Sequence, residues 1–175
     1  MVVWIIGYSG SGKTYLASRL LKKIKGKKIH IDGDDVRKFL TYDLKYSLSD
    51  RKKNSKFISD LCKFLESKNY YVVCSILSIF REHQINNRLK FDKYFQIYLQ
   101  SDFKSIKIRN NKKVYSKNKQ IVGIDIKFPK PLKNDLIIKN KFKPYSEKMF
   151  NSILKKINYV KKRSWISYKF KKKKI

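Results

Sequence analysis

The sequence predicts an α/β fold with three layers, in which helices cover both faces of a mostly parallel central sheet. Short apolar runs alternate along the chain with longer segments whose apolar residues recur every three or four positions. Strands that alternate with helices in this way form parallel sheets. One run, Tyr70–Ile76, is almost continuously β-branched or aromatic, which is typical of a strand buried on both faces.

The first half of the chain supplies three strands and two helices. Val2–Ile6 is an apolar run that ends in glycines, so we expect the first core strand there. Lys28–Ile31 precedes an Asp-Gly turn and is expected to be the second strand, and Tyr70–Ile76 the third. Apolar residues at helical spacing predict helices over Lys13–Lys25 and Asp50–Lys68.

The second half continues the same alternation. We expect strands at Tyr94–Leu99 and Leu136–Ile138, a short helix at Ser101–Ile108, and helices at Arg81–Arg88 and Ser146–Val160. The segment 110–119 is rich in Lys and Asn and is predicted to be a mobile loop. No repeat or linker divides the chain, so we expect one domain over residues 1–160, followed by a basic, aromatic tail over 161–175.

The composition excludes several classes of protein. A hydrophobic content of 42% argues against disorder. No apolar run approaches the roughly 18 residues of a membrane span, and the N-terminus lacks the basic start of a signal peptide, so a cytoplasmic location is expected. Cys62 and Cys74 lie in apolar stretches and are expected to be buried, reduced thiols.

The net charge of +31 has two interpretations. It indicates either binding to nucleic acid or anionic membranes, or lysines scattered over a solvated surface. The lysines are spread along the whole chain and arginines are few, so we favour the second interpretation and do not expect nucleic acid as a partner.

The strongest functional signal is a glycine-rich motif directly after the first strand. Its eight residues, Gly7-Tyr8-Ser9-Gly10-Ser11-Gly12-Lys13-Thr14, match the P-loop pattern in full. Backbone N–H groups of such a loop surround phosphate oxygens at a helix N-terminus. Lys13 would reach the β- and γ-phosphates of ATP, and Thr14 would ligate Mg²⁺. With this motif, the predicted α/β fold is more specifically the three-layer fold of P-loop NTPases and kinases.

Two acidic residues form the second signal. Asp32 and Asp34 follow the second strand, and ligands of open α/β sheets bind outside the carboxyl ends of strands. One carboxylate could hold Mg²⁺ through water, and the other could accept a proton from an acceptor hydroxyl. An Asp-Gly turn that caps a helix is the alternative, chiefly for Asp35.

Together these motifs resemble the adenylylsulfate kinase family. The resemblance rests on the P-loop, on Asp32-Gly33-Asp34-x-x-Arg37, and on later matches over roughly residues 2 to 140. These later matches are Asp43-Leu44-x-Tyr46-Ser47-x-x-Asp50-Arg51-x-x-Asn54, Ser78-Ile79-Phe80-Arg81, Arg109-x-x-Lys112-x-x-Tyr115 and Gly123-Ile124-Asp125. The family implies a dimeric kinase that phosphorylates the ribose 3′-hydroxyl of a nucleotide.

The resemblance also implies roles for individual residues. Asp34, with Asp32 beside it, would lie near the acceptor hydroxyl, and a lid over both substrates would contain Arg109, on the ATP side, and Lys112. The residues implied to contact the acceptor nucleotide are Arg37, Tyr46, Arg51, Asn54, Leu77, Ser78 and Ile121.

Departures from the family pattern bear on the acceptor. In the family, a phenylalanine and a second aromatic residue stack on the two faces of the acceptor adenine. Ile121 stands in place of that phenylalanine, so Tyr46 is the one aromatic residue left to stack on the base. Stacking on an aromatic ring contributes about 1–3 kcal/mol, so a narrower platform favours another base. We therefore expect the acceptor to be a cytidine nucleotide, namely cytidine diphosphoramidate of capsule biosynthesis. Adenylylsulfate is the alternative acceptor. A P-loop protein that binds nucleic acid through the basic tail, and an ATPase or GTPase switch, are the rival classes.

Overall fold

The central sheet contains five parallel strands. The computed structural model describes residues 1–40, 44–109 and 120–172, and for residues 163–172 the backbone alone. The strands are β1 (Val2–Ile6), β2 (Lys28–Asp32), β3 (Tyr71–Ile76), β4 (Tyr94–Gln100) and β5 (Leu136–Lys139). They lie side by side in the order β2-β3-β1-β4-β5, and every pair is parallel. The predicted α/β class is confirmed, and each strand ends within one residue of its expected position.

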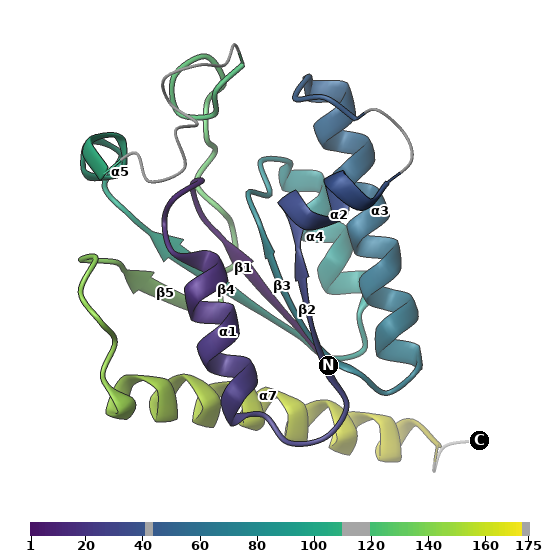
Figure 1. The fold of residues 1–175 in the computed structure, drawn as a ribbon. Helices are drawn as coiled ribbons and strands as arrows, with labels where there is room; N and C mark the ends of the chain where they lie inside the picture. The colour runs from purple at the N-terminus through teal and green to yellow at the C-terminus, as the bar shows by residue number, and fades with distance from the viewer. Residues whose placement is uncertain (41–43, 110–119, 173–175) are drawn as a thin grey trace.

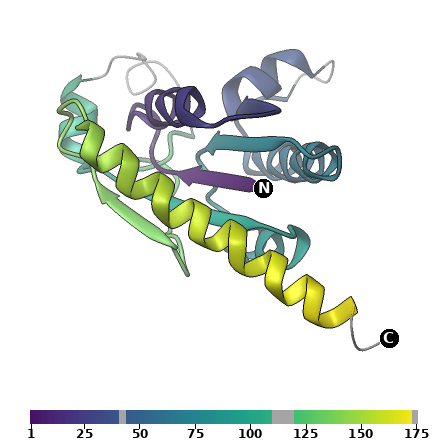
Figure 2. The ribbon, with the colours of Figure 1, turned by 90° about the horizontal axis from the view of Figure 1, so that it is seen from below.

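Helices cover both faces of this sheet, as Figure 1 shows. Val3 and Ile5 of β1 point to the face covered by α1 (Lys13–Lys23) and α7 (Glu147–Lys172), where they join a core that includes Leu16, Leu20, Phe150, Ile153 and Ile157. Val2, Trp4 and Ile6 point to the opposite face, where α3 (Leu48–Ser67) contributes Ile58 and Cys62. The alternation follows from the two-residue period of a strand. Figure 2 shows α7 running the length of its face.

The remaining helices are α2 (Gly33–Phe39), α4 (Arg81–Lys90) and α5 (Phe103–Arg109). Helix α2 was not among the expected elements, but a helix capped at the Asp-Gly turn was the alternative interpretation of this segment, chiefly for Asp35. Asp32 is its N-cap, because its side chain accepts a hydrogen bond from the Asp34 backbone N–H. The expected end of the last helix at Val160 was wrong: α7 continues to Lys172. No glycine or proline follows Ser146 to stop it.

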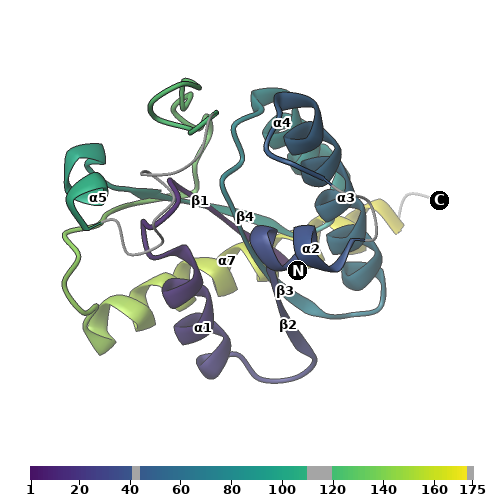
Figure 3. The ribbon, with the colours of Figure 1, turned by 45° about the horizontal axis from the view of Figure 1, so that its top comes forward.

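The carboxyl ends of the strands lie along one edge of the molecule. Figure 3, in which this edge comes forward, shows α2 and α5 on either side of the segments that leave β1 and β3. The P-loop follows β1, Asp32 is the last residue of β2 and Asp34 follows it, so both signals from the sequence lie at this edge. Ligands of parallel sheets bind in this position.

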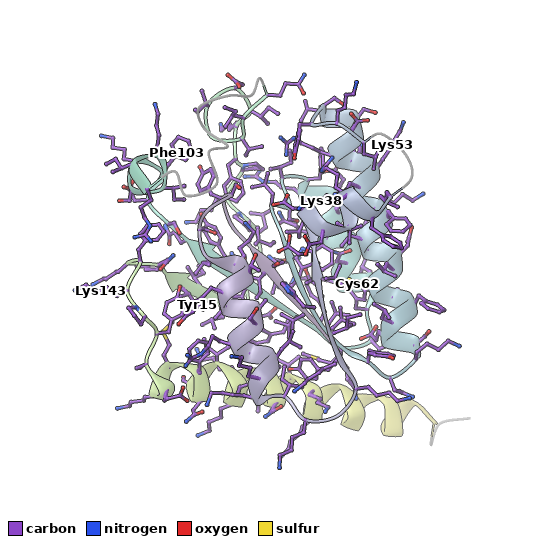
Figure 4. The ribbon with its side chains drawn as sticks, in the orientation of Figure 1. Tyr15, Lys38, Lys53, Cys62, Phe103 and Lys143 are labelled. Atoms are coloured by element: carbon purple, nitrogen blue, oxygen red, sulfur yellow. The ribbon has the colours of Figure 1, made fainter. Side chains whose placement is uncertain are left out.

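Charge and cysteines are distributed as the sequence indicates. Lys53 and Lys143 are exposed and point away from the sheet in Figure 4. Cys62 and Cys74 are fully buried free thiols, as expected, and burial raises the pKa of Cys74. Within the described ranges, the helices are all too short or too polar to cross a bilayer.

Candidate active site

The P-loop joins the buried end of β1 to the first turn of α1. Gly10 and Gly12 have φ angles of 76° and 88°, the left-handed region that favours glycine. A Cβ atom on Gly7 would lie 2.8 Å from the Leu99 carbonyl oxygen, so this position also needs glycine. The Lys13 ammonium group donates a hydrogen bond to the Tyr8 carbonyl oxygen at 2.7 Å. The loop thus has the curled backbone and the cation that a phosphate site requires.

Asp32 lies against the P-loop. The Thr14 hydroxyl donates to Asp32 Oδ2 at 2.8 Å, and the Asp34 backbone N–H donates to Asp32 Oδ1 at 3.0 Å. Burial raises the pKa of Asp32, but the hydrogen bonds from Asp34 N–H, Ser75 and Thr14 outweigh burial, so the net pKa lies below its ordinary value. Asp32 is therefore an ionised carboxylate beside the P-loop hydroxyl.

A second layer of polar groups lies behind Asp32. The Ser75 hydroxyl donates to Asp32 Oδ2 at 2.8 Å, and His30 Nε2 lies 2.8 Å from Ser75 Oγ. The parallel register of β2 and β3 places Asp32 opposite Ser75. Burial lowers the pKa of His30. Neither His30 nor Ser75 was assigned a role from the sequence, because their contact depends on a strand pairing that joins residues 45 positions apart.

The P-loop and the aspartates share one pocket with most of the residues expected to bind the acceptor. The predicted site residues that line it are Ser9, Lys13, Thr14, Asp32, Asp34, Arg37, Tyr46, Arg51, Asn54, Leu77, Ser78 and Ile121. The side chain of Asp34 is exposed. The structure thus brings together residues from the P-loop and the start of α1, from the end of β2, from α2 and α3, from the segment after β3 and from the turn at Ile121.

Two arginines and a tyrosine form one wall of the pocket. The guanidinium carbon of Arg37 lies 4.9 Å from the centre of the Tyr46 ring, and that of Arg51 lies 5.3 Å from it. Arg51 also donates to the Tyr46 carbonyl oxygen at 2.8 Å and to the Gln120 carbonyl oxygen at 3.1 Å. Burial lowers the pKa of Arg51, and the charge of Arg37 lowers it further. Both cations line the pocket, which therefore favours an anionic ligand.

Asn54 and Ser78 provide buried polar atoms at the pocket. Asn54 Nδ2 donates to the Gly33 carbonyl oxygen at 3.3 Å. Asn54 Oδ1 and Ser78 Oγ are both buried and have no hydrogen-bond partner among the described residues. Ser78 has a φ of 51°, an uncommon backbone conformation that is often found at functional sites. Buried polar atoms without partners are costly, so a ligand that pairs with them gains affinity.

Ile121 also lines the pocket and lies in a tight turn. It is 8% exposed, and its carbonyl oxygen accepts hydrogen bonds from the backbone N–H groups of Ile124, Asp125 and Ile126. Gly123 has a φ of 101°, and a Cβ atom there would lie 2.4 Å from the Phe103 ring. The turn therefore fixes an aliphatic side chain where the family pattern has an aromatic one.

The other predicted residues lie outside this pocket. Gly7, Gly10, Ser11 and Gly12 lie in the P-loop, between β1 and α1. The guanidinium carbon of Arg109, at the end of α5, lies 4.8 Å from the centre of the Phe142 ring. Lys112 and the loop expected over 110–119 lie outside the described residues.

Asn140 is a site residue that the sequence analysis missed. Its side-chain amide donates to the Ser11 carbonyl oxygen at 2.7 Å, so the segment after β5 holds the P-loop from behind. Asn140 Oδ1 in turn accepts from the Phe142 backbone N–H at 2.9 Å. No local motif marks this asparagine, because its partner lies 129 positions earlier in the chain.

A metal ion bound with nucleotide would find oxygen ligands here. Thr14 Oγ1 and the Asp32 carboxylate are hard donors, which suit Mg²⁺. Among the described residues, no group of three or more His, Cys, Asp or Glu side chains could hold a metal alone. Mg²⁺ in phosphoryl-transfer sites takes most of its ligands from phosphates and water, so the donor set fits such an ion.

Comparison with known proteins gives one consistent result. Residues 1–139 match the protein family described as adenylylsulphate kinase. Cytidine diphosphoramidate kinase of Campylobacter jejuni is 34% identical over 167 residues, which are 89% of this chain and 95% of that protein. A probable adenylyl-sulfate kinase of Bacillus subtilis is 32% identical over 149 residues, 79% of this chain and 75% of that protein.

A solved structure shares the fold. The APS kinase of Mycobacterium tuberculosis, in complex with AMPPNP and APS, superimposes with a TM-score of 0.78 and covers 90% of this chain and 96% of its own. Its sequence identity of 24% makes this a likeness of fold.

Proposed function

Because this chain belongs to the adenylylsulfate kinase family and is therefore a nucleotide kinase, we propose that it phosphorylates the ribose 3′-hydroxyl of cytidine diphosphoramidate. ATP is the phosphoryl donor and Mg²⁺ its metal ion in this proposal. The observation that carries it is a single pocket lined both by Lys13 and Thr14 of the P-loop and by the Arg37–Arg51 pair. A phosphate donor and an anionic acceptor would meet there.

The P-loop side of the pocket would bind the donor. Backbone N–H groups from Gly7 to Thr14 would surround the β- and γ-phosphates, and Lys13 would exchange its bond to the Tyr8 carbonyl for a phosphate oxygen. Thr14, with Asp32 behind it, would hold Mg²⁺, which neutralises charge on the phosphates when bound. Most of the rate enhancement would come from this electrostatic stabilisation and from positioning.

The two aspartates would then have different roles. Both oxygens of Asp32 already accept hydrogen bonds, and its lowered pKa makes it a poor proton acceptor. We assign Asp34, which is exposed and lines the same pocket, as the general base. The 3′-hydroxyl proton would pass to Asp34 as the new oxygen–phosphorus bond forms and the bond to ADP breaks.

The acceptor side supports a cytidine nucleotide. Arg37 and Arg51 would bind its diphosphate-like group. Ile121 provides an aliphatic contact where an aromatic ring would complete a sandwich, and the Tyr46 ring already lies beneath guanidinium groups. A smaller pyrimidine requires less stacking area than adenine. The relative from Campylobacter jejuni, a cytidine diphosphoramidate kinase matched over most of both chains, supports the same acceptor. A place in capsule biosynthesis is the further part of this proposal.

Adenylylsulfate is the second candidate, favoured by the relative from Bacillus subtilis and by the Arg37–Arg51 anion site. A coupled assay of ADP release, with each acceptor in turn and chromatography of the 3′-phosphorylated product, separates the two. We expect the higher kcat/KM with cytidine diphosphoramidate, and Ile121→Phe to shift the ratio toward adenylylsulfate. Faster turnover of adenylylsulfate by the wild-type enzyme would overturn the cytidine assignment, and turnover of neither would overturn the nucleotide acceptor.

Two further expectations accompany this function. We propose that the enzyme acts in the cytoplasm, where ATP is available, and that it forms the homodimer implied by the family resemblance. Light scattering of the purified protein would measure the oligomeric state directly; a monomer at working concentrations would contradict the second expectation without affecting the reaction.

A further inference from the structure

We propose that His30 and Ser75 are positioning residues, which hold the Asp32 carboxylate against Thr14 so that the Thr14 hydroxyl presents a lone pair to the metal ion of a nucleotide complex. This inference rests on the proposed use of a metal–ATP donor. It adds two residues that touch neither nucleotide nor metal in the proposed function, and it assigns each proton in the hydrogen-bonded chain that they form.

The protons follow from the chemistry of the groups. An ionised carboxylate only accepts hydrogen bonds, so both hydroxyls near Asp32 Oδ2 must donate to it: Ser75 at 2.8 Å and Thr14 at 2.8 Å. Ser75 has then used its single proton, and its oxygen can only accept from His30 Nε2, which lies 2.8 Å away. His30 must therefore carry its proton on Nε2. This holds for both the neutral and the protonated imidazole.

The chain leaves Asp32 little freedom to rotate. Oδ2 accepts two hydrogen bonds and Oδ1 accepts one from the Asp34 backbone N–H. With the Thr14 proton committed to Asp32, the remaining lone pairs of the Thr14 oxygen are free for a cation. Loss of Ser75 would remove one of the three contacts and would let the carboxylate turn away from Thr14. Partners behind a metal ligand commonly change metal affinity by about 10–100-fold.

The strand arrangement explains why a histidine is useful here. β2 is an edge strand, and Asp32 is its last residue, so only β3 can support the carboxylate from within the sheet. Ser75 lies opposite Asp32 in the register and is 1% exposed. His30 is two residues before Asp32 and thus lies on the same face of β2. The His30 ring contacts Ser75 Oγ as a donor, so the Ser75 hydroxyl proton points toward Asp32.

The experiment compares binding of AMPPNP with and without Mg²⁺ by calorimetry. In the wild type, the ratio of the two affinities measures the contribution of the metal. We expect Ser75→Ala and His30→Leu to reduce this ratio about tenfold, with metal-free AMPPNP affinity unchanged. Ser75→Thr keeps the hydroxyl and should restore the ratio. Ser59→Ala is the matched control, since Ser59 is also a buried serine that donates a hydrogen bond, but to Asn87 between α3 and α4.

A second readout needs neither nucleotide nor metal. The chain has two histidines, so nitrogen-15 NMR spectra of the ligand-free protein resolve each ring, and His30→Gln assigns the signals. We expect the Nε2–H form for His30. An Nδ1–H form, or an equal loss of AMPPNP affinity with and without Mg²⁺ in Ser75→Ala, would overturn the inference. Both readouts are independent of the acceptor, so failure of the proposed reaction would appear separately, as absent turnover by a protein that binds Mg²⁺–AMPPNP normally.

Discussion

At the scale of single residues, Lys13 shows how the P-loop is prepared for its ligand. Its ammonium group lies 2.7 Å from the Tyr8 carbonyl oxygen within the same loop. The loop therefore holds its cation within the proposed phosphate site in the absence of a ligand. A cation held in this way loses little freedom on binding, and this preorganisation is a large part of what a phosphoryl-transfer site contributes.

Replacement of Lys13 tests this contribution. We expect Lys13→Ala to lower kcat about 10²–10³-fold, because charge that develops on the transferred phosphoryl group loses its main protein cation. The fold should remain, since the backbone of α1 and the core residues Leu16 and Leu20 are untouched. Steady-state kinetics and thermal melting measure the two effects. Lys22→Ala, an exposed lysine on the same helix, should leave both unchanged; equal losses in the two variants would contradict a specific role.

At the scale of secondary-structure elements, the segment after β5 supports the P-loop. Asn140 donates to the Ser11 carbonyl oxygen at 2.7 Å, and its own backbone N–H donates to the Gln100 carbonyl oxygen at 2.7 Å. The asparagine thus links β4, β5 and the loop between β1 and α1. The P-loop is thus held by an element far from it in the sequence.

We expect Asn140→Ala to raise the KM for ATP several-fold with a smaller change in kcat. One hydrogen bond of about 1 kcal/mol that holds the loop is lost, while Lys13 and Thr14 remain. Lys141→Ala, a change to the exposed next residue, is the control. Kinetics at varied ATP concentration provide the measurement. A fall in kcat without a change in KM would mean that Asn140 acts on the chemical step instead.

The elements also show what could be predicted from the sequence. Buried apolar runs such as Val2–Ile6 and Tyr71–Ile76 were located to within a residue, because a strand buried on both faces has a local signature. The P-loop and Asp32 were found for the same reason, because each belongs to a motif of residues that are adjacent in the sequence. His30, Ser75 and Asn140 acquire their roles from strand register and tertiary contact, which a local pattern does not contain. The end of helix α7 was predicted too early because a lysine-rich sequence is compatible with both a helix and an irregular tail.

At the scale of the whole molecule, the charge of +31 and the long α7 raise the question of what the C-terminal residues do. The buried core residues of α7 are Phe150, Ile153 and Ile157, and Val160 is the last described residue of the helix that packs against the same core, before the helix ends at Lys172. The positive charge is spread over the chain, so the field that would attract anionic nucleotides does not depend on one segment.

Deletion of residues 164–175 tests both points. It removes five lysines and no acidic residue, so the formal net charge falls from +31 to +26. We expect kcat, and the rise of KM for ATP with added KCl, to change less than twofold, because most of the positive charge remains. If the deletion abolished turnover, α7 beyond its core contacts would be part of the active enzyme. Strong, salt-sensitive RNA binding lost on deletion would instead favour the nucleic-acid alternative.

The two buried thiols give the protein an internal reporter. Cys62 on α3 and Cys74 on β3 lie in the core beside the strands that end at the site, and neither is exposed. A thiolate reacts by attacking the disulfide of the reagent, and burial raises the pKa of Cys74 and so disfavours its thiolate. Both thiols are also closed off from solvent, so labelling requires the sheet and α3 to separate first. The rate at which a chromogenic disulfide consumes these sulfhydryls therefore reports opening of the nucleotide-binding half. A substrate that binds only the closed form should slow this rate by a factor of about 1 + L/Kd, where L is its free concentration.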